Sequence, residues 1–129
     1  MENAIRAGCP SFTCTCSEPM VTTGYALENM MPARASGLAT IRVNNGYMST
    51  SCTEVIGPWL DAINIDLRSM DDAFYLRICG AGVEPVLDNL RQIFRSRIHP
   101  ENSTPVSGPY GQPRHARSAD RIHCAGSRP

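Results

Sequence analysis

The chain has 129 residues, a length that allows one domain. Its twelve arginine residues, with no lysine, are balanced by twelve acidic residues, so there is no net charge to attract nucleic acid or an anionic membrane surface. With 42% hydrophobic residues and no run of about 18 apolar residues, the sequence predicts a folded chain with no membrane span and no nucleic-acid partner.

The first predicted strand covers residues 11–17, which are small and compatible with β-structure, and Pro19 stops its ladder. A helix is predicted next, over residues 27–35. Its apolar stripe consists of Leu27, Met30, Met31 and Ala35. Gly37 stands where a helix commonly ends, and Pro32 removes a backbone donor inside the helix, so we expect a kink there.

The middle of the chain continues the alternation of strands and helices. Residues 39–43 alternate with period two and run into Asn44-Asn45-Gly46, which is typical of a strand followed by a tight turn. A short helix is expected over residues 50–56, and a third strand over residues 62–67. The side chains of that strand face two ways, with Ile63, Ile65 and Leu67 on one face and Asn64, Asp66 and Arg68 on the other.

Two helices are expected after the third strand. Ser69 and Asp72 have the spacing of a capping box, and Gly80-Ala81-Gly82 ends the helix that they begin. The clearest helix pattern covers residues 83–94, with Pro85 in the first turn, where a missing donor is harmless. Its apolar stripe consists of Val83, Val86, Leu87, Leu90, Ile93 and Phe94. These alternating elements predict an α/β fold with parallel strands.

The composition changes at His99. Residues 99–129 contain five of the ten prolines and almost no branched aliphatic residues, so they bury too little surface to offset the entropy of ordering. We therefore expect a folded domain over residues 1–98 and a disordered tail over residues 99–129. The three histidines, His99, His115 and His123, all fall in that tail, and we assign them no ligand role.

Polar side chains stand where the predicted strands end. Glu18 follows the first strand, Asn44 and Asn45 follow the second, and Asp66 and Arg68 lie at the end of the third. In parallel α/β folds the C-terminal ends of the strands meet at one edge, where active sites form, so these side chains should face one mouth. Taken singly, each has a structural explanation: an exposed carboxylate, a turn, and an ion pair.

The six cysteines lack the spacing of a metal site. Cys9, Cys14 and Cys16 are separated by four residues and one residue, and no Cys-x2-Cys pair is present. The residues after Met1 contain no apolar segment of the signal-peptide kind, so we expect a cytoplasmic protein with reduced cysteines. Burial is the expected role, including that of Cys79, and a metal or thiol site built from the first three cysteines is the alternative.

Five segments, in chain order, resemble one protein family. They are Ser17-Glu18-Pro19 and residues 43–48, 59–68, 74–75 and 78–89. The sequence from about residue 4 to residue 98 resembles the AmmeMemoRadiSam-system radical SAM proteins, which are relatives of the pyruvate formate-lyase activating enzymes. The resemblance implies a fragment of a partial (β/α) TIM-like barrel. It also implies S-adenosylmethionine (SAM) and a 4Fe-4S cluster as cofactors, with reductive cleavage of SAM to a 5′-deoxyadenosyl radical.

The resemblance also implies roles for the strand-end residues. Ser17 and Glu18 match the strand end whose oxygens accept hydrogen bonds from the methionyl ammonium of SAM. Asn44 and Asn45 match a strand end beside the cofactor. Asp66-Leu67-Arg68 matches the Asp-Leu-Lys of the family, whose cation pairs with the methionyl carboxylate, and Arg68 keeps that charge on a longer, planar group.

The sequence departs from the family in two places. The Cys-x3-Cys-x2-Cys motif that holds the cluster is absent, so this chain has no cluster ligands and no metal ligand is assigned. A shift of one base between Thr104 and Ser107 would restore a segment of the family type, so we expect a frameshift there. We interpret the chain as a fragment of a radical SAM enzyme that is inactive alone. The alternative is a non-catalytic remnant that binds SAM or completes its barrel with another chain.

Overall fold

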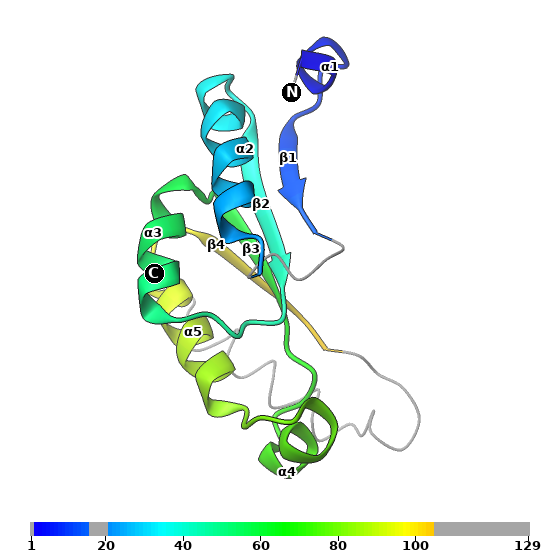
Figure 1. The fold of residues 1–129 in the computed structure, drawn as a ribbon, viewed down its shortest axis with the longest axis vertical. Helices are drawn as coiled ribbons and strands as arrows, with labels where there is room; N and C mark the ends of the chain where they lie inside the picture. Colours follow the sequence, from blue (N-terminus) through cyan, green and yellow to red (C-terminus); the bar gives the residue numbers. More distant parts are fainter. Residues whose placement is uncertain (1, 16–20, 105–129) are drawn as a thin grey trace, which may run out of the picture.

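Four strands form one parallel sheet. The computed structural model describes residues 2–15 and 21–104, and within them the strands are β1 (Ser11–Cys14), β2 (Ala39–Asn44), β3 (Ala62–Asp66) and β4 (His99–Ser103). The strands lie in the order β1-β2-β3-β4, and every neighbouring pair is parallel. Each strand is therefore added beside the one that precedes it in the chain (Figure 1). The predicted α/β fold with parallel strands is confirmed.

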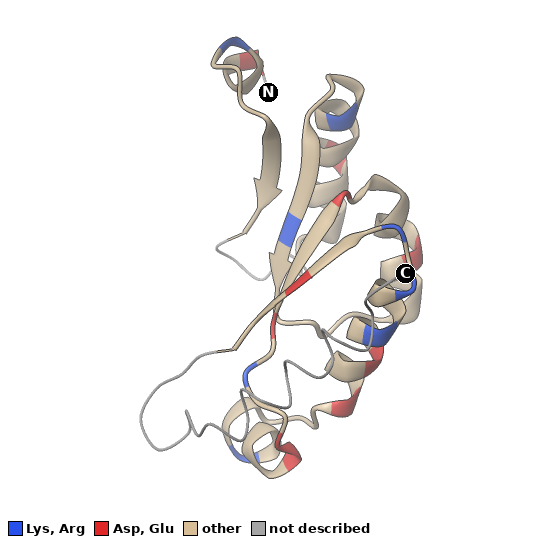
Figure 2. Ribbon diagram, turned by 180° about the vertical axis from the view of Figure 1, so that it is seen from behind, with Lys and Arg blue, Asp and Glu red and all other residues tan. Residues whose placement is uncertain are grey.

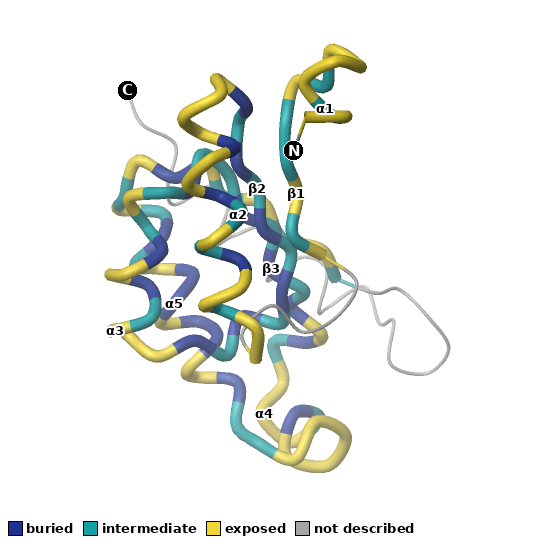
Figure 3. Tube along the Cα trace, turned by 45° about the horizontal axis from the view of Figure 1, so that its top comes forward, coloured by how far each residue is buried: buried dark blue, intermediate teal, exposed yellow. Residues whose placement is uncertain are grey.

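One helix precedes the first strand, and further helices connect successive strands. Their bounds are α1 (Glu2–Arg6), α2 (Thr23–Ala35), α3 (Thr50–Ile56), the 3-10 turn η1 (Gly57–Trp59), α4 (Asp72–Phe74), the π-helix η2 (Tyr75–Cys79) and α5 (Glu84–Phe94). Right-handed crossovers that always move in one direction place their helices on one face of a sheet. Figure 1 and Figure 3 show α2, α3 and α5 together on one side of the sheet. Among the described residues the other face is left uncovered, and we call it the inner face.

The two faces of the sheet differ in burial. Ile63 and Ile65 of β3 face the helices and are 1% and 0% exposed, whereas the intervening Asn64 lies half-buried on the inner face. This is the predicted division of the third strand. In β2 the buried, helix-facing side chains are instead polar (Thr40, Arg42 and Asn44), and the apolar side chains that alternate with them point to the inner face.

The hydrophobic core lies between the helices and the sheet. The predicted stripe of α5 is confirmed, since Val86, Leu90 and Ile93 are at most 1% exposed. In α2 the buried side chains are Ala26, Met30 and Ala33, whereas Met31 is 45% exposed. The predicted stripe of α2 was thus wrong in part, because small alanine side chains occupy the positions closest to the sheet.

The helix after β3 begins differently from the prediction. Asp71, not Ser69, caps α4, because its Oδ1 accepts a hydrogen bond of 2.9 Å from the backbone nitrogen of Ala73. The chain then continues as the π-helix η2, and Gly80 ends it with a φ of 75°. Asp72 accepts a hydrogen bond of 2.8 Å from the backbone nitrogen of Val83 and so ties this segment to the start of α5.

The expectation of disorder from His99 onward is wrong for the first residues of that range. Residues 99–103 form β4, in which His99 lies opposite Ala62 of β3 and donates a backbone hydrogen bond of 2.9 Å to the carbonyl of Asp61. Backbone pairing, rather than side-chain burial, holds this polar strand. Residues 105–129, the suspected frameshift after Thr104, His115 and His123 lie outside the described residues.

No helix within the described ranges has the length and apolar content needed to cross a bilayer. Charged residues of both signs are interspersed along the described elements (Figure 2).

Candidate functional site

The C-terminal ends of the parallel strands bring polar groups to one edge of the sheet. β2 ends at Asn44, β3 ends at Asp66 and β4 ends at Ser103. We call the group formed by Asn45, Asp66, Arg68 and Ser103 the strand-end site. β1 ends at Cys14, earlier than predicted, and Ser17 and Glu18 lie outside the described residues.

Asp66 is the centre of the strand-end site. Its Oδ1 accepts a hydrogen bond of 2.5 Å from Ser103 Oγ, and its Oδ2 lies 3.3 Å from Arg68 Nη2. The side chain of Arg68 is 50% exposed, so this ion pair contributes little to stability. Its effect is to hold the guanidinium over the end of β3, where the remaining N–H donors can meet a carboxylate. Sequence reasoning missed Ser103, because it assigned that residue to the tail.

Tyr75 fixes the backbone at Arg68. Its hydroxyl oxygen accepts a hydrogen bond of 3.0 Å from the Arg68 backbone nitrogen, and the residue is 2% exposed. Burial raises the pKa of the Tyr75 hydroxyl, while the bond from Arg68 lowers it in part. Because the net direction is upward, the hydroxyl stays neutral at physiological pH and remains an acceptor for the Arg68 backbone.

The loop after β2 is a pair of Asx turns. Asn44 Oδ1 accepts a hydrogen bond of 2.8 Å from Gly46 N, and Asn45 Oδ1 accepts one of 2.9 Å from Tyr47 N. Asn44 is 3% exposed on the helix-facing side, whereas Asn45 is half-buried just after the end of β2. The structure therefore separates the two asparagines that the sequence grouped together.

Asn89 of α5 clamps the same loop, and no sequence pattern indicated this contact. Its Nδ2 donates hydrogen bonds of 2.8 Å to the carbonyls of both Gly46 and Met48. Gly46 has a φ of +79°, and a Cβ there would meet Val86 Cγ1 at 2.7 Å. The loop is thus held by its own turns and by α5 from behind.

Arg42 is a fully buried cation between β2 and α2. Its Nη2 donates a hydrogen bond of 3.3 Å to Thr23 Oγ1. The neighbouring Cys14 thiol has its pKa raised by burial and lowered in part by the positive charge of Arg42. The thiol is therefore protonated at neutral pH and is a poor nucleophile.

The described cysteines form no metal centre. Within residues 2–15 and 21–104 there is no group of three or more histidine, cysteine, aspartate or glutamate side chains placed to hold an ion. Cys9, Cys14 and Cys52 are half-buried, and Cys79 is exposed, so its predicted burial was wrong. Cys16 and Cys124 lie outside the described residues.

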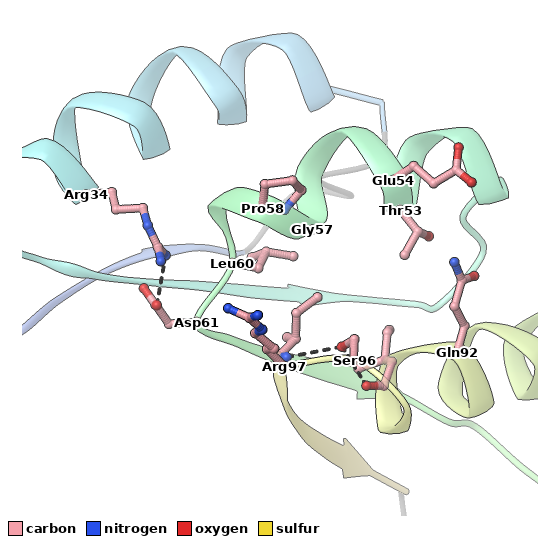
Figure 4. Close-up of a pocket in the computed structure, with 12 residues that line it drawn as sticks. Arg34, Thr53, Glu54, Gly57, Pro58, Leu60, Asp61, Gln92, Ser96 and Arg97 are labelled. Carbon is pink, nitrogen blue, oxygen red and sulfur yellow. Dashed lines mark hydrogen bonds and ion pairs between the residues drawn. The ribbon is translucent and has the colours of Figure 1, made fainter.

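A cavity lies at the opposite end of the strands. It has a volume of about 690 Å³ and opens between η1 and the C-terminal part of α5 (Figure 4). On its rim Arg34 Nη1 lies 2.8 Å from Asp61 Oδ1, while Arg97 projects into the opening. Because parallel α/β folds place their active sites at the C-terminal ends of strands, the strand-end site is the better candidate despite this cavity.

Comparison with known protein sequences gives a relative of unknown function. No family model matches the sequence. The chain is similar to the uncharacterized protein MJ0808 of Methanocaldococcus jannaschii, with 33% identity over 91 residues that cover 70% of this chain and 26% of that protein. The chain thus spans about a quarter of the length of this relative.

A solved structure is similar over a larger part of the chain. It is a domain of pyruvate-formate lyase-activating enzyme from Bacteroides vulgatus ATCC 8482, with a TM-score of 0.76 and 14% identity. The match covers 87% of this chain and 70% of that one. The chain therefore has the α/β fold of a domain of a pyruvate-formate lyase-activating enzyme.

Proposed function

We propose that this chain is part of a radical SAM enzyme related to the pyruvate formate-lyase activating enzymes, and that its strand-end site binds the methionyl group of SAM. The observation that carries the proposal is Asp66-Leu67-Arg68 at the end of β3, in a chain with the fold of an activating-enzyme domain. Because the chain spans about a quarter of its longer relative, the rest of the site would come from another part of the protein.

The donors of the strand-end site fit the methionyl carboxylate. One guanidinium nitrogen of Arg68 is engaged by Asp66 at 3.3 Å, which leaves the other donors of a half-exposed group for a two-point contact. Asn45 uses its Oδ1 within the loop, so its amide nitrogen is the donor that can face the same ligand. By resemblance, Ser17 and Glu18 would accept hydrogen bonds from the methionyl ammonium. Bound SAM would supply a sulfonium that an external electron can cleave.

The described residues do not fit an iron-sulfur cluster. They contain no group of three or more metal-ligating side chains, and a cluster needs three cysteine thiolates besides SAM. We therefore derive no redox step from this chain. The function that we propose for it alone is binding, with catalysis assigned to the longer protein of which it would be a part.

Titration calorimetry with SAM tests the binding. We expect heat for the wild-type chain, and at least a tenfold weaker Kd for Arg68→Ala, equivalent to about 1.4 kcal/mol. Arg97→Ala is the matched control, because that arginine lies at the opposite end of the strands and should leave Kd unchanged. Absence of heat with the wild-type chain would contradict the proposal, and equal losses in both variants would contradict the assignment to Arg68.

A further inference from the structure

The cavity between η1 and the C-terminal part of α5 has the dimensions of a small-molecule site. Its volume of about 690 Å³ falls within the range of roughly 300–1,000 Å³ that such sites occupy. Every residue that lines it belongs to residues 34–98, which the structure describes throughout. The described walls of the cavity therefore come from one continuous segment of the chain.

Part of the wall is apolar and preformed. Leu60, Ile93 and Ile98 line the cavity and also belong to the hydrophobic core, where each is at most 6% exposed. Close packing in the core fixes the positions of these side chains before any ligand enters. A ligand with an apolar body can therefore leave water and contact this wall without rearranging the protein.

Arg97 is the unused cation of the cavity. Within the described ranges its guanidinium forms no ion pair and no hydrogen bond, and Figure 4 shows it projecting into the opening. It is not needed to cap the end of α5, because the carbonyl of Ile93 already accepts hydrogen bonds from the backbone nitrogen of Ser96 at 2.9 Å and from its hydroxyl at 2.7 Å. The five N–H donors of Arg97 therefore remain available to a ligand.

The carboxylates that line the cavity leave this charge uncompensated. Asp61 is already engaged, since it accepts hydrogen bonds from Thr40 N at 2.8 Å, from Thr40 Oγ1 at 3.2 Å and from Arg34 Nη1 at 2.8 Å. Glu54, the other carboxylate among the lining residues, lies at the far end of the opening from Arg97 (Figure 4). The end of the cavity at Arg97 therefore favours an anion.

The far end of the cavity disfavours a second negative charge. Glu54 and Gln92 line it there, and neither side chain forms an ion pair or a hydrogen bond within the described part of the chain. The carboxylate of Glu54 repels another anionic group, whereas the amide of Gln92 accepts an uncharged one. The two ends of the cavity therefore differ in the charge that they select.

We propose that this cavity binds a small organic anion, a carboxylate or a phosphate ester, that is charged at one end only and has an apolar body. The anionic group accepts hydrogen bonds from the guanidinium of Arg97, and the body lies against the apolar wall. The uncharged end lies near Gln92. The site is at the opposite end of the strands from the strand-end site, and the proposal goes beyond SAM binding and is independent of it.

A titration of the full chain with sodium hexanoate, followed by two-dimensional NMR, is the first test. We expect saturable shifts of the amide signals of Ser96, Arg97 and Ile98, and no saturable shifts with sodium chloride at the same ionic strength. Hexanol lacks the charge and adipate carries a second one, so both should bind at least tenfold more weakly than hexanoate. Hexanol that binds as tightly as hexanoate would overturn the proposal.

Hexyl phosphate separates the two kinds of anion. Binding tighter than that of hexanoate assigns the cavity to a phosphate ester, and weaker binding assigns it to a carboxylate. Absence of saturable shifts with both anions would contradict the proposed site.

Three variants assign the binding to particular side chains. Arg97→Ala should weaken the binding of hexanoate at least tenfold. Arg95→Ala is the matched control, because this exposed arginine carries the same charge two residues earlier but does not line the cavity, and the Kd should not change. Glu54→Gln should reduce the preference for hexanoate over adipate to less than threefold. Equal losses in the two arginine variants, or an unchanged preference in Glu54→Gln, would show that the cavity does not bind the anion as proposed.

Discussion

At the scale of single residues, Asp61 joins more elements than any residue of the strand-end site. Its Oδ2 accepts hydrogen bonds from Thr40 N at 2.8 Å and Thr40 Oγ1 at 3.2 Å, and its Oδ1 accepts one from Arg34 at 2.8 Å. Its own backbone bonds to Thr40 and to His99. The bond from the Thr40 backbone is the main reason that the pKa of Asp61 lies below its ordinary value.

This network predicts an acid-sensitive part of the stability. Because the folded pKa of Asp61 is lowered, its contribution is present above the unfolded value of about 3.9 and is lost as the pH falls through the folded value. Asp61→Asn should lower the free energy of unfolding at pH 7 by about 1 kcal/mol, since the carboxylate is partly exposed and screened. Urea unfolding at pH 7 and pH 3 checks this. A difference between variant and wild type that persists undiminished at pH 3 would contradict the role of the charge.

Gly46 and Gly37 form a matched pair of glycines. Both have a φ of 79°, but a Cβ at Gly46 would lie 2.7 Å from Val86 and 2.8 Å from Ile65, whereas nothing lies within 4 Å of a Cβ at Gly37. Gly37→Ala should cost about 1 kcal/mol of backbone strain, and Gly46→Ala at least about 2 kcal/mol more because the core must shift. Thermal or urea unfolding measures both, and equal losses would show that the packing around Gly46 yields freely.

At the scale of elements, patterns of apolar residues predicted the helices better than the polar contacts that join them. The stripe and Pro85 were sufficient to predict α5, but Asn89 lies on the buried side of that helix and its partners are in a loop 41 to 43 residues earlier. A polar residue on a buried helix face indicates that it has a hydrogen-bond partner, but the sequence does not show which residue that partner is. The candidate site was likewise predictable only in part. The order of the elements predicted that its residues lie at strand ends, but it did not predict that Ser103 binds Asp66.

Strand patterns indicated the period but not the face. Residues 39–43 alternate as predicted, yet the buried side chains among them are Thr40 and Arg42, and Ile41 faces the inner side. β4 escaped prediction because its residues are polar and include Pro100, which an edge strand tolerates. Backbone pairing with β3 holds β4 in the sheet, and the composition of residues 99–103 gave no sign of this pairing.

The clamp between α5 and the loop after β2 can be measured directly. Asn89→Leu keeps the size of the side chain but leaves the buried carbonyls of Gly46 and Met48 without their donor, at a cost of about 2–4 kcal/mol. Asp88→Ala, on the exposed face of the same helix, should change the free energy of unfolding by less than about 0.5 kcal/mol. Losses of similar size in the two variants would show that the clamp contributes no more than a surface ion pair.

At the scale of the whole molecule, the sheet has two inner strands and two edges, and hydrogen exchange should reveal this. In dilute solution the amides of β2 and β3 should exchange most slowly, because each of these strands has neighbours on both sides. Within β1 the amide of Phe12 should be protected and that of Thr13 should exchange at least tenfold faster, since only the former points to β2. Two-dimensional NMR in deuterated solvent compares these two neighbours, and equal rates would contradict the pairing of β1 with β2 alone.

The strand order also bears on how the chain is made. Every strand after the first pairs with the strand synthesised just before it, and no pairing links the beginning of the described chain to its end. A polypeptide leaving the ribosome can therefore complete each pairing in turn, with no segment held open for a distant partner. The sheet can grow vectorially, from the N-terminal strand to the C-terminal one, while translation continues.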